Sequence, residues 1–308
     1  MKVLIFGFGS IAKKHYQALM KIDPSAEVFA YRSQAHSEII ENLNSIYKTE
    51  DIPQNAPYDF VLISNPTFKH SETIELALRL NCPIFIEKPL FHNLDLDKVL
   101  GKIALSGIMT YVACNLRFLD SIIYTREILL PKIKINEVNV YCGSFLPEWR
   151  KGVDYKTVYS AHEDQGGGVH LDLIHELDYI YWFFGKPLAV SSHRRSKSTL
   201  AIDAIDYANY FLEYENFAVN VILNYYRKDI KRSIEIVGQD NTYYIDLCLN
   251  SVSSTNSVIF KSNQNVIDTY KTQLEYFISH LSETSNKENK LMNSVEEAFE
   301  VLKICLKS

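Results

Sequence analysis

Glycine is scarce in this chain of 308 residues: it has 11 glycines, about half of the roughly 7% found in average proteins. Five of them nevertheless stand in two tight groups, Gly7/Gly9 and Gly166–Gly168. A chain that avoids glycine elsewhere and concentrates it in two places needs a tight turn or a close approach there. We therefore take the two groups as the first candidates for functional turns.

Other scarcities exclude whole classes of protein. The five cysteines are widely spaced and form no CxxC pair, which argues against a disulfide framework or a zinc site. A formal net charge of -5, with short basic stretches only at 193–197 and 227–232, argues against a nucleic-acid binder. No apolar run approaches the ~18–20 residues that span a bilayer, and the N-terminus lacks the apolar stretch of a signal peptide. We expect a soluble, cytoplasmic protein that binds no metal, no membrane and no nucleic acid.

The order of the apolar segments predicts an α/β protein. Short apolar runs alternate with helical patterns over the first part of the chain, which indicates a parallel sheet. Strands are expected there at 2–6, 27–31, 59–64, 83–87 and 109–114, and helices at 11–22, around 74–80 and at about 95–105.

The rhythm changes near residue 120. After a helix at about 120–130, strand-like stretches follow one another and predict a mostly antiparallel sheet, at 138–145, 188–195, 205–214, 217–226 and 232–238. One helix at about 169–184 interrupts them and a last helix covers about 295–306, while the polar stretch 281–290 is expected to be an exposed loop. We therefore expect one domain over residues 1–118 and a second over residues 119–308.

The first glycine group lies between a strand and a helix, as GFGSIA at 7–12. In this context a G-x-G-x-x-A pattern is typical of dinucleotide binding, because the first glycine allows the turn and the second lets the backbone approach a pyrophosphate. The charge of that pyrophosphate would rest on the N-terminus of the helix. A tight turn without a ligand is the alternative.

The end of the second strand should carry the residue that reads the adenosine ribose, about 20 positions after the glycines. Arg32 and Ser33 stand there in place of Asp or Glu. A guanidinium beside a hydroxyl suits the 2′-phosphate of NADP better than the 2′-hydroxyl of NAD. We expect NADP, and NAD stays possible if Arg32 only stacks on the adenine.

The second glycine group precedes the helix expected at 169–184. At 100° per residue, Asp172, His175, Glu176 and Tyr179 fall on the face opposite the apolar stripe. Such a polar face can simply meet water. An Asp–His pair one turn apart is also a plausible proton-transfer unit, in which the carboxylate orients the imidazole. The three glycines favour a close approach at the start of this helix.

A third motif is Glu87-Lys88-Pro89 at the end of the strand PIFIE. Ligands of open α/β sheets bind outside the carboxyl ends of the strands, so Lys88 is placed to meet a cofactor or a substrate. Standing alone, it could equally be a solvent-exposed lysine.

Taken in order, these motifs resemble those of the Gfo/Idh/MocA oxidoreductases, named for glucose–fructose oxidoreductase and inositol dehydrogenase. The resemblance covers nearly the whole chain and is carried by GFGSIAKKH (7–15), SNPTFKH (64–70), EKP (87–89), NLRF (115–118) and GGGVHLDLIHELDY (166–179). It implies an N-terminal Rossmann NAD(P)-binding domain. It further implies a C-terminal α/β domain with a large open-faced, mostly antiparallel sheet that binds substrate and often forms the interface of a homodimer or homotetramer.

The resemblance also implies a reaction, the reversible transfer of a hydride between nicotinamide and a secondary alcohol of a sugar, sugar acid or cyclitol. Lys88 would contact the reacting hydroxyl, His175 would be the acid/base and Asp172 its carboxylate partner. The cofactor-binding set expected from the motifs and the resemblance is Gly7, Phe8, Gly9, Ser10, Ile11, Arg32, Ser33, Asn65, Pro66, His70, Glu87 and Lys88. The stretch 149–168 is similar to a branch associated with surface-polysaccharide and sugar-acid synthesis.

The substrate pocket is expected to draw on Arg117, Arg150, Tyr155 and Tyr159, and two arginines suggest an anionic group on the substrate. One departure from the family concerns the histidine, which follows Asp172 by three residues where many members have four. Glu176 takes the fourth place and is the alternative proton acceptor. Two other functions stay open at this point: a dinucleotide-binding sensor without turnover, and a redox-neutral enzyme that holds its cofactor tightly.

Overall fold

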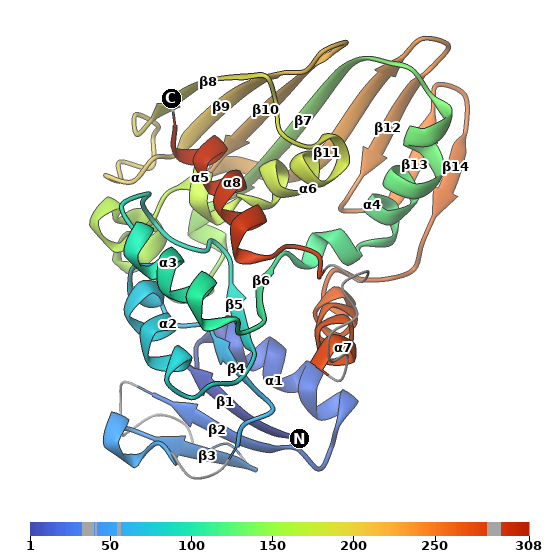
Figure 1. The fold of residues 1–308 in the computed structure, drawn as a ribbon. Helices are drawn as coiled ribbons and strands as arrows, with labels where there is room; N and C mark the ends of the chain where they lie inside the picture. The colour runs from blue at the N-terminus through green and yellow to red at the C-terminus, as the bar shows by residue number, and fades with distance from the viewer. Residues whose placement is uncertain (33–39, 41, 54–56, 282–290, 308) are drawn as a thin grey trace. The chain divides into compact units, whose positions relative to one another are not determined.

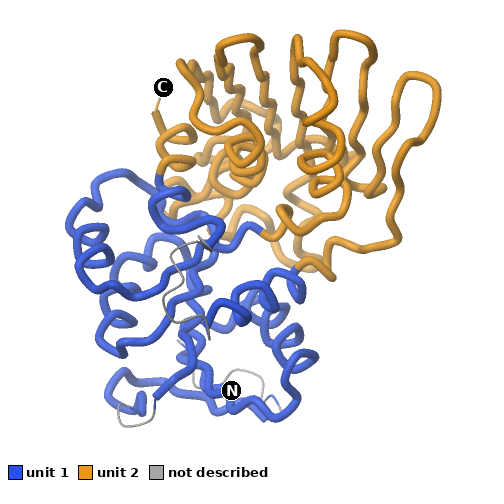
Figure 2. Tube along the Cα trace, turned by 45° about the vertical axis from the view of Figure 1, so that its right-hand side comes forward, with its two compact units in different colours: residues 1–114, 270–299 blue, residues 115–269, 300–308 orange. Residues whose placement is uncertain are grey.

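The computed structural model describes residues 1–32, 40, 42–53, 57–281 and 291–307. These residues divide into two compact units (Figures 1 and 2), the first made of 1–114 and 270–299 and the second of 115–269 and 300–308. The chain therefore returns to the first unit after building most of the second. The division at residue 118 that we expected from the sequence does not include this return.

The first unit is built on a six-stranded parallel sheet with the order β3-β2-β1-β4-β5-β6. The two halves run outward from β1 and β4, which is the doubly wound arrangement of dinucleotide-binding folds. β1, β4, β5 and β6 are almost entirely buried, as their continuous apolar sequences require. Its strands are β1 (Lys2–Phe6), β2 (Glu27–Tyr31), β3 (Leu43–Ile46), β4 (Phe60–Ile63), β5 (Ile84–Glu87) and β6 (Thr110–Ala113).

Helices accompany this sheet, and two of them come from the far end of the chain. The helices of the first unit are α1 (Ser10–Ile22), α2 (His70–Leu78), α3 (Asp97–Ser106), α7 (Asp268–Leu281) and the beginning of α8 (Val295–Leu306). From α7, the fully buried ring of Phe277 packs edge-on against Phe60 at 5.2 Å and Phe85 at 5.3 Å between ring centroids. The core of the N-terminal sheet is therefore completed by residues that follow it by about 200 positions.

The second unit is built on an eight-stranded sheet with the order β14-β13-β12-β11-β7-β10-β9-β8. Its neighbours are antiparallel apart from β7 and β10, which are parallel. The strands are β7 (Ile135–Phe145), β8 (Ala189–Arg195), β9 (Tyr207–Glu213), β10 (Ala218–Asn224), β11 (Tyr226–Gly238), β12 (Thr242–Asp246), β13 (Ser251–Ser254) and β14 (Val258–Lys261).

One face of this second sheet is covered by helices, as Figure 1 shows. They are α4 (Asp120–Tyr124), α5 (Val169–Asp172), α6 (His175–Phe184) and the end of α8. The buried Tyr210 of β9 ties this layer to the sheet by donating its phenol O–H to the Cys305 carbonyl of α8 at 2.9 Å. The side chains on the other face of the sheet alternate with the buried ones and are exposed or half-buried.

The expected fold class is confirmed, with differences in single elements. The sequence patterns did not predict β3, α7 or β12–β14. They predicted one continuous helix at 169–184, which the structure divides into α5 and α6. The predicted helix at 120–130 continues beyond α4 as a π-helical turn at Thr125–Leu129. Of the predicted loop 281–290, residues 282–290 lie outside the described residues. Within the described chain, no helix is both long enough and apolar enough to span a membrane.

Candidate active site

The first glycine group forms the turn between β1 and α1. Gly7 has a φ of +83°, and a Cβ at this position would lie 2.6 Å from the Cα of Asn65, so glycine is required by both the backbone and the neighbouring loop. A Cβ at Gly9 would meet nothing within 4 Å. Gly9 caps α1 without a side-chain hydrogen bond, and the first turn carries no acidic residue. The N-terminus of α1 is therefore an approachable site for an anion.

The predicted neighbours of this turn lie in or beside it. Ser10 and Ile11 are the first two residues of α1, and the ring of Phe8 lies 5.8 Å from that of Tyr16. Arg32 directly follows β2 and is 7% exposed, its guanidinium 5.5 Å from the Phe8 ring and its Nη1 donating to Ser45 Oγ at 3.2 Å. Ser33 lies outside the described residues.

His70 connects two loops at the carboxyl ends of β4 and β5. The imidazole is 1% exposed, with Nε2 at 3.0 Å from the carbonyl oxygen of Asn65 and Nδ1 at 3.1 Å from that of Leu90. Burial lowers the pKa of His70, and the two carbonyls oppose this effect. Asn65 donates its side-chain amide to Thr73 at 2.6 Å, and Pro66 precedes the 3-10 turn Thr67–Lys69. His70 therefore links the loop that follows β4 to the loop that follows β5, where the cofactor is predicted to bind.

Glu87 and Lys88 lie at the end of β5. Glu87 is 7% exposed, and its carboxylate lies 2.5 Å from Nε2 of the fully buried His15 in α1 and accepts the Lys88 backbone N–H at 3.2 Å. Lys88 itself is half-buried, and its peptide bond to Pro89 is cis. The contact between Glu87 and His15 thus joins the Glu87-Lys88-Pro89 motif to α1.

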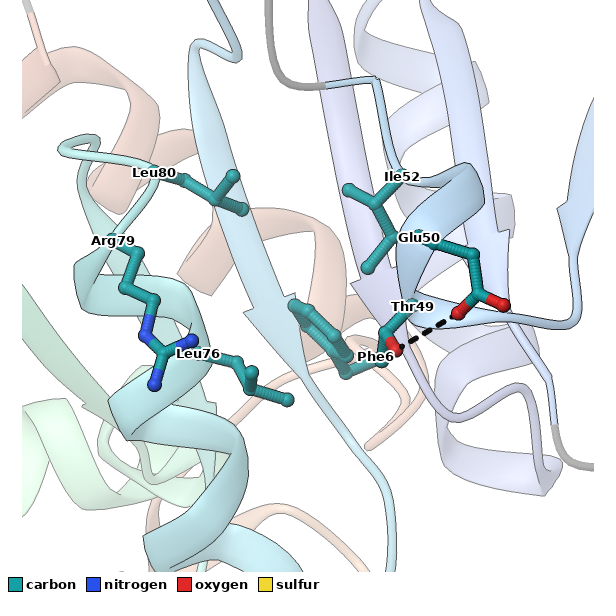
Figure 3. Close-up of a pocket in the computed structure, with 7 residues that line it drawn as sticks. All are labelled: Phe6, Thr49, Glu50, Ile52, Leu76, Arg79 and Leu80. Atoms are coloured by element: carbon teal, nitrogen blue, oxygen red, sulfur yellow. Dashed lines mark hydrogen bonds between the residues drawn. The ribbon is translucent and has the colours of Figure 1, made fainter.

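A separate pocket of about 370 Å³ lies beside β1 in the first unit (Figure 3). Leu76, Arg79 and Leu80 approach it from the end of α2 and the residues after it, and Thr49, Glu50 and Ile52 approach it from the turn after β3. Phe6 lies between these two groups. The lining residues include none of the predicted cofactor-binding residues, so the pocket does not extend the site described above.

In the second unit, another backbone segment of the chain packs closely against the second glycine group. A Cβ at Gly167 would overlap the carbonyl oxygen of Tyr159 and lie 2.7 Å from that of His162, and the Gly167 N–H donates to this His162 carbonyl at 2.9 Å. The prediction of a close approach here is confirmed. The segment that approaches is 159–162, which carries Tyr159.

The helix that follows is interrupted, and its polar residues do not meet water. Asp172 ends α5 and His175 begins α6, with i→i−3 hydrogen bonds at Ile174 and Glu176 across the break. Asp172 is 6% exposed, His175 9% and Glu176 0%. The expectation of a single helix with one polar face was therefore wrong: the tighter turn redirects the chain, and all three ionisable groups are buried.

The Asp172 carboxylate lies between two tyrosines. Tyr159 donates its phenol O–H to Oδ1 at 2.9 Å, and Tyr225 donates to Oδ2 at 2.5 Å. Both phenols have a raised pKa, for Tyr159 mainly because of the nearby Asp172 charge and for Tyr225 mainly because of burial. Each therefore stays protonated and remains a hydrogen-bond donor.

Glu176, the alternative proton acceptor, is engaged in an ion pair. Its carboxylate accepts from Nε of Arg232 at 2.6 Å and from Nη2 at 3.2 Å, and its side chain is 0% exposed. A carboxylate held by a guanidinium in this way has its oxygens already engaged, so it is less available to receive a proton from a substrate. The geometry thus favours His175 over Glu176.

The four predicted substrate residues have different surroundings. Arg117 is 1% exposed and donates two hydrogen bonds to Asp178 of α6, at 2.8 and 2.7 Å, so it holds this helix in place. Arg150 is half-buried, with its guanidinium 5.5 Å from the Tyr159 ring. Tyr155 donates to the Leu200 carbonyl at 3.0 Å. Tyr159 contacts Asp172, and Arg150 lies beside the ring of Tyr159.

Three residues that matter to this geometry were not predicted: His15, Tyr225 and Arg232. His15 stands within the quoted GFGSIAKKH motif, so the sequence held a signal for it. Tyr225 and Arg232 act on residues 53 and 56 positions away along the chain, and neither belongs to a motif.

Comparisons with known proteins cover both units. Residues 1–105 match the family model described as the oxidoreductase family, NAD-binding Rossmann fold (GFO_IDH_MocA), and residues 132–304 match the one described as the C-terminal alpha/beta domain of the oxidoreductase family. A search of curated proteins found no match.

Solved structures with the same fold include several enzymes. UDP-N-acetylglucosamine 3-dehydrogenase GnnA from Acidithiobacillus ferrooxidans is 18% identical with a TM-score of 0.79, covering 99% of this chain and 95% of its own. Myo-inositol 2-dehydrogenase from Lactobacillus plantarum gives the same values, 18%, 0.79, 99% and 95%. Biliverdin reductase from Synechocystis, in complex with biliverdin and NADP+, is 14% identical with a TM-score of 0.78, covering 98% and 96%.

Proposed function

Because this chain belongs to the Gfo/Idh/MocA family of oxidoreductases, we propose that it transfers a hydride between a nicotinamide cofactor and a secondary alcohol or ketone of a sugar, sugar acid or cyclitol. The observation that carries the proposal is the arrangement at the carboxyl edge of the first sheet. The glycine turn, the Asn65 loop and the Lys88 loop are joined there by His70 and Glu87. In open α/β sheets this edge is where ligands bind.

The residues of the first unit fit a dinucleotide. The N-terminus of α1 has no capping side chain and no acidic residue, and there is open space at Gly9, so a pyrophosphate could be held by Gly9, Ser10 and Ile11. Arg32 would hold the 2′-phosphate of NADP, and Asn65 and Pro66 would flank the nicotinamide ribose. When bound, the cofactor supplies the hydride acceptor or donor.

The chain's own residues would supply positioning and proton transfer. Lys88 would donate to the reacting oxygen and stabilise the negative charge that develops there. His175 would take the hydroxyl proton on its imidazole, and the Asp172 carboxylate would stabilise the resulting cation. Arg150 would contact the substrate, and an anionic group such as a carboxylate would suit its charge. The named activities of the similar dehydrogenases support a sugar or cyclitol, and biliverdin reductase marks the range of chemistry that the same fold accommodates.

The test is a panel of myo-inositol, UDP-N-acetylglucosamine, UDP-glucuronate and biliverdin, scored at the nicotinamide absorbance band with NAD(H) and NADP(H) in parallel. We expect turnover with at least one of the three carbohydrates. Lys88→Met should lower kcat by about 100-fold or more while leaving the cofactor Kd nearly unchanged. The exposed Lys98 of α3 offers the matched control, Lys98→Met, which should keep full activity. Full activity of Lys88→Met would contradict the assignment.

The same assay decides the cofactor. Arg32→Ser should weaken NADP(H) binding by about tenfold or more and leave NAD(H) binding nearly unchanged, because a guanidinium–phosphate contact is lost. The exposed Arg79 in the same unit provides the control Arg79→Ser. Equal losses for both cofactors in Arg32→Ser would show that Arg32 does not read the 2′-phosphate.

A further inference from the structure

The carboxylates of Asp172 and Glu176 in the second unit are held by different kinds of hydrogen-bond donor, one neutral and one cationic. Glu176 is held by the guanidinium of Arg232, which neutralises its charge. Asp172 accepts hydrogen bonds from two phenols, which stabilise a carboxylate without adding a positive charge to it. Both carboxylates are buried, and a buried charge needs such donors. The Glu176 carboxylate is therefore paired with a cation, whereas the donors to the Asp172 carboxylate are neutral.

Tyr225 is held in place by contacts other than its hydrogen bond to Asp172. It stands between β10 and β11 and is 0% exposed. Its backbone N–H donates to the Asp206 carbonyl at 3.0 Å, and its carbonyl accepts from the Leu146 N–H at 2.8 Å. The Trp149 ring packs edge-on against its ring at 5.3 Å. The phenol oxygen therefore has a defined position that does not depend on Asp172.

Tyr159 approaches Asp172 from a different segment. It lies in the 3-10 turn Tyr159–Ala161, and the missing side chain of Gly167 lets its carbonyl come close to the start of α5. The two phenols therefore reach Asp172 from the 146–168 segment and from the end of β10, and together they engage both of its oxygens. A carboxylate held at both oxygens has a fixed rotamer.

We propose that Tyr225 and Tyr159 are positioning residues that hold the Asp172 carboxylate in a fixed orientation while His175 gains and loses its proton. This inference rests on the proposed oxidoreductase function. It gives Tyr159 a different role from substrate contact, and it gives a role to Tyr225, which no motif marks. Removing either phenol oxygen should slow proton transfer and leave substrate binding intact.

The experiment is a double-mutant cycle in the full-length protein, using the carbohydrate of the panel with the highest turnover. The variants are Tyr225→Phe, Tyr159→Phe, Asp172→Asn and the two double variants. Each Tyr→Phe change should lower kcat by about tenfold with KM and cofactor Kd within about twofold. Combined with Asp172→Asn, each should cause no further loss of kcat, because the phenols act through the carboxylate. Tyr210→Phe is the matched control: it removes a buried phenol bound to the Cys305 carbonyl of the same unit and should leave kcat unchanged.

The outcomes separate the inference from the function beneath it. Losses that add to that of Asp172→Asn, or a Tyr225→Phe variant that behaves like Tyr210→Phe, would overturn the positioning role and leave the oxidoreductase function standing. A Tyr159→Phe variant that raises KM with kcat unchanged would restore Tyr159 to substrate contact and likewise overturn its positioning role. Absence of turnover in the unsubstituted protein would overturn the proposed function and the inference with it. If Tyr225→Phe does not fold, as judged by circular dichroism, the Tyr159→Phe arm decides alone.

Discussion

At the scale of single residues, Gly167 is the glycine whose replacement should be most damaging in the second unit. A methyl group there would overlap the Tyr159 carbonyl oxygen, and both partners are backbone atoms that cannot turn aside. Gly167→Ala should lower the free energy of unfolding by about 2 kcal/mol or more, measured by denaturant titration. Gly101 is the control, because it lies in α3 with nothing within 4 Å of its missing Cβ. Gly101→Ala should raise stability by about 0.5–1 kcal/mol, and equal effects of the two changes would contradict this account.

His170 gives the second unit a dependence on pH. Burial lowers its pKa from 6.5 to about 3. Between these values the unfolded chain binds a proton that the folded chain does not, so the free energy of unfolding falls as the pH falls from about 6.5 toward about 3. One such histidine contributes a slope of about 1.4 kcal/mol per pH unit. In His170→Asn the slope between pH 6 and pH 5 should be shallower by about that amount, and unchanged slopes would count against it.

What the sequence could reveal about the site depends on the reach of each interaction. Gly7, Lys88, Asp172 and His175 stand in short motifs whose meaning is local: a turn, a strand end, a helix turn. The partner of Asp172 is different, because Tyr225 is one of 20 tyrosines in the chain and its selection depends on how β10 ends against the 146–168 segment. Arg117 shows what a charge alone does not reveal. Its charge suggested a ligand, whereas the fold supplies Asp178 as its partner.

At the scale of elements, α6 is held to the sheet by an ion pair whose carboxylate is fully buried. Glu176 at its first turn is 0% exposed and meets Arg232 of β11. Arg232→Met would leave a buried carboxylate without its counter-charge and should cost about 3 kcal/mol of stability, as measured by denaturant titration. The control is Arg227→Met, which breaks the exposed pair with Asp229 and should cost less than about 1 kcal/mol. Similar costs for the two would show that burial does not govern the pair.

The missed elements were missed for different reasons. In α7, Tyr270, Leu274, Phe277 and Leu281 follow a helical spacing, so this helix was within reach of the sequence. β3 has only four residues, LNSI, with two polar ones in the middle, and its pairing with β2 decides its conformation. The break between α5 and α6 could not be read from periodicity, because the apolar spacing continues across it. It is set by the tertiary partners of Asp172 and Glu176 on either side.

At the scale of the whole molecule, the uncovered face of the second sheet has one row with two basic residues and another with two acidic ones. One row across the strands aligns Arg195, Tyr207, Asn224, Gly143 and Lys231. Six residues further along β9, roughly 20 Å away, another row aligns Glu213 and Glu137. A second copy related by a twofold axis perpendicular to the strands would set the basic row of each against the acidic row of the other. We propose that the expected homo-oligomer forms through this face.

Charge reversal tests this interface. Lys231→Glu should shift the protein toward monomer, as measured by light scattering at micromolar concentration, because like charges would then face each other. The exposed Lys98 of the first unit supplies the control Lys98→Glu, which should leave the assembly unchanged. A monomeric unsubstituted protein, or an oligomer indifferent to Lys231→Glu, would refute the interface.

The return of residues 270–299 to the first unit has a consequence for synthesis on the ribosome. When the nascent chain has emerged to about residue 118, Phe60 and Phe85 still lack the Phe277 ring that covers them in the finished fold. About 150 further residues must be translated before α7 emerges, which takes roughly ten seconds or more at usual rates. During that interval the apolar surface around Phe60 and Phe85 lacks the cover that α7 provides in the finished fold. The part of the chain that is made first therefore waits longest for its core to be completed, and we expect it to be prone to aggregation until near the end of translation.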